Sequence, residues 1–239
     1  MAGRWRAGSL GGLLLLLVGT SACTRSLEAT YAPAMTPLEQ ADALRSARLG
    51  IARFQDVRRT VRADEPASSA YIASAGAWRF GLTYQGREMT PVADLVQSLF
   101  VEEFGRGGVR SSPLPEVLTK DALPAMRAAG ERAVVDHVLG GRIAVFEFEN
   151  EDKFWYVRSR RSVALEIHLL RVAEGALTLD TTATGTDEKD EGLGILHTTN
   201  VDRLLNRVFR LVVFKVVEEV ARKLALDPRD VRVRVAVRR

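Results

Sequence analysis

Apolar residues follow two different periods along the chain, and the change of period separates helical from extended segments. After Thr90-Pro91 they recur every three or four residues, which predicts an amphipathic helix that Gly105, Gly107 and Gly108 close. A threonine oxygen can accept a bond from an unpaired amide, and proline tolerates the first helical position, so the helix is expected to begin there. A second, wider helical stripe spans 201–224. The apolar positions are Val92, Leu95, Val96, Leu99, Phe100 and Phe104 in the first helix, and Val201, Leu204, Leu205, Val208, Leu211, Val212, Val216, Val220 and Leu224 in the second.

Extended segments fill the stretch between these helices. Two long runs joined by a polar turn, and a third run after Glu174-Gly175, predict an antiparallel meander. The three runs are 134–148, 154–172 and 176–185; further strands are expected at 48–54, 78–84 and 231–237. The expected fold class is therefore α+β, an antiparallel or mixed sheet with two long amphipathic helices packed on one face.

The remaining segments are less regular. Residues 111–133 contain three prolines and predict a loop followed by a short helix over 120–129. The acidic stretch 187–194 predicts a solvated loop, and a short helix is expected at 38–44.

The first 22 residues have the pattern of a secretory leader. Arg4 and Arg6 precede an apolar stretch over 10–18, and Thr20-Ser21-Ala22 supplies small side chains before Cys23. The apolar stretch has nine residues, fewer than the roughly 20 that span a bilayer.

Small residues ending at a cysteine resemble the lipobox of bacterial lipoproteins, although Thr20 stands where that motif has a larger aliphatic residue. The resemblance implies that Cys23 carries a diacylglycerol and a fatty acyl chain such as palmitate, and that Thr24, which is not aspartate, favours the outer membrane. Two or three acyl chains anchor a protein stably. The alternative is plain cleavage after Ala22, which leaves a free thiol. The expected parts are a leader at 1–22, a lipidated terminus and tether at 23–45, and one periplasmic domain at 46–239.

Charge and composition narrow the class of partner. The formal charge of +4 falls to 4 − 2 = +2 once the leader arginines are removed, and no basic run is interleaved with stacking aromatics. We therefore do not expect nucleic-acid binding.

Several segments together resemble the YajG family of outer-membrane lipoproteins. The matching text is LGIARFQDVR at 49–58, TPVADLVQSLFVEEFGRGG at 90–108, LGGRIAVFEFE at 139–149, RRSVALEIHLLRVAEGAL at 160–177 and NVDRLLNRVFRLVVFKVVEEVARKL at 200–224. A second resemblance is to the auxiliary lipoproteins of ABC-type lipid or polymer transport systems. Either implies an envelope lipoprotein with a binding or accessory role, and neither implies a catalytic residue.

The sequence offers little catalytic chemistry. It has no G-x-S-x-G elbow, and its one cysteine precedes the domain. The three histidines, His137, His168 and His197, lack zinc-ligand spacing, and 187–191 lacks the calcium-loop rhythm. We expect no enzyme activity, no metal and no cofactor beyond the covalent lipid.

A possible binding face follows from the meander. A symmetric turn at 149–153 would pair Phe148 with Phe154, Phe146 with Tyr156 and Arg142 with Arg160, placing them with Arg158 on one face. That aromatic and arginine-rich face would dock an envelope protein or an anionic envelope component; alternatively, 57–89 or 111–133 folds over it. The next turn pairs His168 with Asp180, and Arg232 and Arg234 are expected to join the same face. The oligomeric state is left open.

Overall fold

The structure is a computed structural model. It describes residues 24–28, 46–58, 71–75, 78–84, 86–87, 90–152, 156–192, 207–208, 211–212 and 215. Cys23, Phe154 and the segments 38–44 and 231–237 lie outside these residues, so the expectations for them stay predictions.

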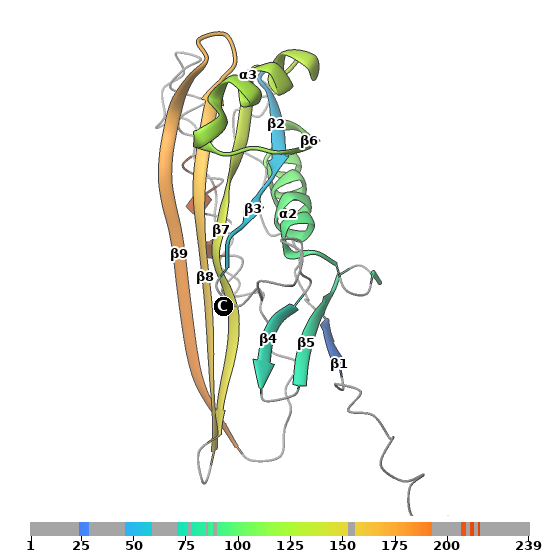
Figure 1. The fold of residues 1–239 in the computed structure, drawn as a ribbon, viewed down its shortest axis with the longest axis vertical. Coiled ribbons are helices and arrows are strands. Elements are labelled where there is room, and N and C mark those ends of the chain that lie inside the picture. The colour runs from blue at the N-terminus through green and yellow to red at the C-terminus, as the bar shows by residue number, and fades with distance from the viewer. Residues whose placement is uncertain are drawn as a thin grey trace, which may run out of the picture.

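A mixed sheet of six strands forms the body of the molecule (Figure 1). Its order is β6-β2-β7-β8-β9, and β3 extends the line of β2 along β7. The bounds are β2 Arg48–Arg53, β3 Gln55–Asp56, β6 Arg110–Val117, β7 His137–Asp152, β8 Tyr156–Arg171 and β9 Ala176–Gly192. The expected α+β class and the antiparallel meander of β7, β8 and β9 are confirmed.

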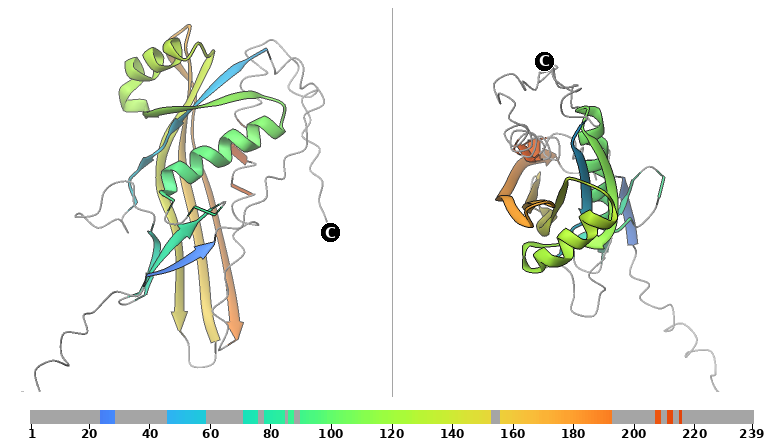
Figure 2. Two further views of the ribbon diagram at one scale, coloured as in Figure 1. Left: turned by 90° about the vertical axis from the view of Figure 1, so that its right-hand side faces the viewer. Right: turned by 90° about the horizontal axis from the view of Figure 1, so that it is seen from above.

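A smaller sheet of three strands lies beside the main one (Figure 2). Its middle strand is β5, Trp78–Thr83, which pairs antiparallel with β4, Tyr71–Ala75, and parallel with β1, Thr24–Glu28. The strand expected at 78–84 is thus confirmed. Residues 24–28, expected to belong to a tether, form a strand instead.

Helix α2, Val92–Arg106, packs on one face of the main sheet. Its side chains form one core with Phe54 of the β2–β3 connection and with β7 and β8; the Phe54 and Phe100 rings stack with centroids 5.5 Å apart. Val208 and Val212, helical as expected, join the same core. Thr90 does not cap the helix, because its Oγ1 donates to the carbonyl of Arg87.

A shorter helical segment covers part of the opposite face. It consists of the 3₁₀ turn η1, Lys120–Ala122, and α3, Leu123–Arg132. Met126 and Ala129 pack there on Val138 and Leu170 in a second core. A side chain at Gly130 would overlap Val172, so the glycine lets α3 approach the sheet closely. The alternative that 111–133 folds over this face is confirmed for this part of it.

Two of the expected loops are strands. Residues 110–117 form β6 despite two prolines, because β6 is an edge strand with a partner on one side only. The acidic residues after Thr186 continue β9 to Gly192, where β8 supplies arginines as cross-strand neighbours: Arg161 pairs with Asp187 and Arg160 with Glu188. Opposite charges in that position stabilise a sheet.

The predicted register between β7 and β8 is wrong. Phe146 pairs with Val163, Arg142 with Glu166 and Arg160 with Glu149. The strands run past the expected turn to Asp152 and Tyr156, and a bulge between Ile143 and Val145 adds one residue, Ala144, on β7. One extra residue exchanges the two faces of a strand. Phe146 therefore lies fully buried in the core with α2, and it is not part of an outer binding face.

Candidate functional site: a polar cluster beneath the 3₁₀ turn

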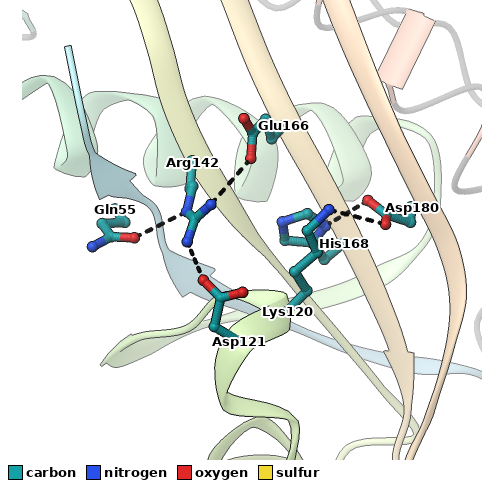
Figure 3. Close-up of polar contacts among 7 residues, drawn as sticks. All are labelled: Gln55, Lys120, Asp121, Arg142, Glu166, His168 and Asp180. Carbon is teal, nitrogen blue, oxygen red and sulfur yellow. Dashed lines mark hydrogen bonds and ion pairs between the residues drawn. The ribbon is translucent and has the colours of Figure 1, made fainter. Parts of the chain in front are cut away.

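Seven polar residues gather on the sheet face opposite α2, next to η1 (Figure 3). The main sheet supplies five of them from four strands, and η1 supplies two. They are Gln55 of β3, Arg142 of β7, Glu166 and His168 of β8, Asp180 of β9, and Lys120 and Asp121 of η1. Alternation along the strands brings these residues to one face, because cross-strand neighbours share a side.

Arg142 is the centre of one half of the cluster. Its Nε donates to Gln55 Oε1 at 3.1 Å, one terminal nitrogen donates to Asp121 Oδ2, and the other lies 3.7 Å from Glu166 Oε2. The guanidinium thus contacts three elements at once. It joins η1 to β3 and β8, and its charge meets two carboxylates.

His168 and Lys120 share the carboxylate of Asp180 in the other half. His168 Nδ1 lies 3.0 Å from Asp180 Oδ1, and Lys120 Nζ donates to Oδ2 at 3.2 Å. The pairing of His168 with Asp180 was expected from the turn at Glu174-Gly175 and is confirmed. The imidazole is fully buried, and its Nε2 has no hydrogen-bond partner among the described residues.

The surroundings lower two pKa values in this half. Burial lowers the pKa of the His168 imidazole below its ordinary value, and the nearby Asp180 carboxylate offsets this effect only in part. The hydrogen bond from Lys120 lowers the pKa of Asp180. At neutral pH His168 is therefore uncharged, and Asp180 is a carboxylate that pairs with Lys120.

We call these seven residues the clasp, because two ion pairs among them hold η1 to the sheet. Lys120 and Asp121 are neighbours of opposite charge, and they reach opposite charges on β9 and β7. Two cations, Lys120 and Arg142, face three carboxylates, and no serine, threonine or cysteine is among the seven residues. Within the described part of the chain, no group of three or more His, Cys, Asp and Glu residues is placed to hold a metal ion.

The predicted site residues are divided by the structure. Arg142 belongs to the clasp, and Phe146 belongs to the core. Arg160 is exposed and pairs with Glu188 of β9 at 3.3 Å. By strand register Tyr156 and Arg158 share the face of Arg160, whereas Phe148 follows Phe146 on the other face.

Sequence reasoning did not find Lys120, Asp121, Gln55 and Glu166. A lysine and an aspartate side by side in a proline-rich stretch carry no signal of their own, because their partners are 21 and 60 residues away. The His168–Asp180 pair could be found because one short turn separates the two residues.

An exposed polar strip continues the clasp face along β9. Asp180, Thr182, Thr184, Thr186 and Glu188 alternate with inward positions and are all exposed. Where its side chains are described, this strip therefore presents hydroxyls and charges.

Comparisons with known proteins add distant structural similarities. No family model and no curated protein matches the chain. The fold is similar to protein XCC0632 from Xanthomonas campestris, of family DUF330, with 14% identity and a TM-score of 0.41 over 81% of this chain and 91% of that one. It is also similar to a PelC dodecamer from Paraburkholderia phytofirmans, with 12% identity and a TM-score of 0.37 over 80% of this chain and 94% of that one. A third similarity is to lipoprotein GNA1162 from Neisseria meningitidis, with 10% identity and a TM-score of 0.36 over 74% of this chain and 99% of that one. At these values no ligand, partner or assembly of those proteins transfers to this chain.

Proposed function

We propose that this chain is an envelope protein anchored to the periplasmic face of the outer membrane through an acylated Cys23, and that it acts by binding. The observation that carries the proposal is the pattern of basic, apolar and small residues that ends at the one cysteine of the chain. No described helix is long and apolar enough to cross a membrane. The YajG resemblance stays a prediction.

The position of β1 supports anchoring at this residue. Thr24, the residue after Cys23, is the first residue of β1 and pairs with Arg79 of β5. An acyl group on Cys23 would therefore be attached directly to the small sheet, with no intervening linker. Processing before Cys23 would leave this strand whole, because the cleavage site precedes its first residue.

The binding role is assigned to the polar strip of β8 and β9. Arg160 and the exposed threonines of β9 present hydrogen-bonding groups beyond the area that η1 and α3 cover. The buried position of Phe146 leaves the described part of this strip polar, so a hydrophilic envelope component fits it better than an apolar ligand.

The transport alternative predicts an apolar cavity between helices and sheet. In the described part of the chain, side chains fill the space between α2 and the sheet: Phe54, Phe100, Phe104 and Phe146 are each at most 1% exposed. No observation therefore favours a lipid-carrying cavity at this position.

Acylation is tested by growing cells with a palmitate analogue and separating inner from outer membranes. We expect the label in the protein, an outer-membrane position, and loss of both in Cys23→Ser. Ser21→Ala is the matched control, because it keeps a small residue two positions before the cysteine and should leave label and fractionation unchanged. Unlabelled wild-type protein in the soluble periplasmic fraction would contradict the proposal.

A further inference from the structure

Strand β9 forms one edge of the main sheet. It is 17 residues long and pairs with β8 alone, and no other described segment lies along its outer side (Figure 1). Every second residue of an edge strand turns an unpaired backbone amide and carbonyl outward, and such an edge is a template for another strand. Strand β9 has one irregularity, at Thr178, and pairs without a shift from Leu179 to Gly192. This long regular part has the properties of a strand-accepting edge.

The opposite edge of the sheet is protected. Strand β6 carries Pro113 and Pro115, which lack amide hydrogens and cannot complete a ladder with a further strand. Strand β9 contains no proline, and five of its 17 residues are threonine, which favours extended structure. The two edges thus differ, and β9 is the one suited to pairing.

The charge of β9 selects the type of strand that fits. Asp180 and Glu188 are exposed, and Asp187, Asp190 and Glu191 add negative charge toward its end, with Lys189 alone opposing them. A basic strand with alternating apolar residues is complementary to such an edge. The sequence holds one segment of this kind, VRVRVAVRR at 231–239, which lies outside the described residues.

The same chain cannot readily supply this strand to its own β9. Strand β9 ends at Gly192, yet Lys215 Nζ donates to Thr181 Oγ1 at 3.1 Å, so the chain has by then returned along the sheet. A strand after this return would run parallel to β9. The connection would therefore be a crossover between parallel strands.

The handedness of that crossover is unfavourable. Strand β9 runs parallel to β2, because β2 is parallel to β7 and the chain reverses twice from β7 to β9. Helix α2 and the helical residues Val208 and Val212 share one core, so both connections pass over the same face. The crossover from β2 to β6 leads toward the β6 edge of the sheet, whereas a crossover from β9 to a strand outside it would lead toward the opposite edge. Because both would pass over the same face, the two crossovers would have opposite handedness. About 98% of such crossovers are right-handed.

The pairing of two β9 strands about Thr184, near the middle of the strand, is also unfavourable. An antiparallel pair centred on Thr184 would place Asp180 of each copy opposite Glu188 of the other. Like charges directly opposite each other destabilise a sheet. A strand donated by the basic segment of another copy has neither defect, because the crossover rule applies within one chain.

We infer that the outer edge of β9 accepts residues 231–237 of a second copy of this chain, which joins the copies by strand addition. In the added strand the valines then lie on the same face of the sheet as Thr181 and Ala183, which point inward. The arginines lie on the same face as Asp180 and Thr182, which are exposed. The inference does not depend on acylation.

Disulfide trapping between two different chains tests this directly. In full-length Cys23→Ser protein, one preparation carries Thr182→Cys and another carries Arg234→Cys, and the two are mixed and oxidised. We expect a disulfide-linked dimer that contains one chain of each kind. A matched mixture of Ser112→Cys, on the exposed side of β6, with Arg234→Cys should give none.

Three outcomes would overturn the inference. A disulfide that forms only within a doubly substituted chain, at monomer mass, would assign the segment to its own β9. Dimers of a Thr184→Cys preparation with itself would indicate pairing of two β9 strands about Thr184, and absence of any disulfide would show that the edge is unoccupied.

Removal of residues 231–239 gives an independent measurement. Light scattering should report an oligomer for the full chain and a monomer for the truncated one, and circular dichroism should show that both are folded. The outward amides of β9 should exchange at least about tenfold faster after truncation, because they lose their partners. Equal masses and equal exchange rates would contradict strand donation.

Discussion

Asp56 and Arg58 form an enclosed ion pair where β3 ends. Arg58 Nε donates to Oδ1 at 2.8 Å and Nη2 donates to Oδ2 at 2.7 Å, and neither side chain is exposed. Arg58 Nη1 also donates to the carbonyl of Phe146, two residues beyond the bulge at Ala144. A planar guanidinium suits this two-point contact, and the pair ties β3 to β7 where the strand changes face.

Removing one partner of this pair should destabilise the protein strongly. Asp56→Ala leaves a buried guanidinium without its carboxylate, so we expect the free energy of unfolding to fall by about 3–5 kcal/mol. Urea denaturation measures the change. Asp121→Ala is the matched control, because Asp121 also pairs with an arginine but is exposed; its cost should stay at or below about 1 kcal/mol. Equal losses in the two variants would show that enclosure of the Asp56 pair has no energetic effect.

His168 should make stability depend on pH. The pKa of this buried imidazole in the folded protein lies below its ordinary value of 6.5, which applies in the unfolded chain. Between the folded and the unfolded pKa the unfolded chain therefore binds more protons than the folded one. The contribution is fully present above about pH 6.5 and is lost as pH falls toward the folded pKa, with a limiting slope of about 1.4 kcal/mol per pH unit.

Unfolding by urea between pH 7.5 and 5 measures this slope, and His168→Gln should remove the part due to this residue. The carboxylates titrate in a separate window. Hydrogen bonds from Lys120 and Arg132 lower the pKa values of Asp180 and Glu116, so their contributions are present above their ordinary values of 3.8 and 4.5 and are lost below them. An unchanged slope in His168→Gln would refute the assignment.

At the scale of elements, β7 depends on two adjacent glycines, because a side chain at Gly140 would overlap the carbonyl oxygen of Leu118, and Gly141 is enclosed more tightly still. A side chain at Gly141 would overlap the carbonyl oxygen of Glu166 on β8 and crowd the ring of Phe54. Gly141→Ala should therefore lower the free energy of unfolding by about 1–3 kcal/mol, because the backbone must move. Gly105→Ala in α2 meets nothing within 4 Å and should raise stability by about 0.5 kcal/mol. Thermal denaturation of the two variants checks the opposite signs.

The elements that sequence predicted well are those with local causes. The apolar spacing from Val92 to Phe104 lies within one helix, and glycine ends it: Gly107 follows α2, and Gly108 has a φ of 85° that few other residues adopt. The turn at Glu174-Gly175 likewise fixes β8 against β9, because Gly175 has a φ of 64° and the loop is short.

The elements that sequence missed have distant causes. Nothing near Ala144 marks a bulge, since the extra residue is defined only by what β8 places opposite. Strand β6 is extended because β2 lies beside it, although Pro113 and Pro115 argue for a loop. The clasp on η1 could not be predicted without both of these features. Arg142 lies just before the bulge, and Lys120 lies just after β6.

At the scale of the whole molecule, β1 connects the expected anchor to the fold. Deleting residues 24–28 leaves β5 without its parallel partner but leaves both described cores intact. Hydrogen exchange should then accelerate in β5 and stay unchanged in α2 and β8. Replacing the same five residues by glycine and serine is the control for chain length, and it should behave like the deletion. Equal acceleration throughout would show that β1 supports the entire domain.

The bulge at Ala144 has a consequence for how the meander's surface can change. Ala144 is the residue without a partner on β8, so its deletion alone would restore simple alternation and leave Phe146 opposite Val163, facing inward, and Glu147 opposite Ser162, facing outward. Gain or loss of one residue at this position can therefore be absorbed by the bulge, while every residue beyond it keeps its face of the sheet.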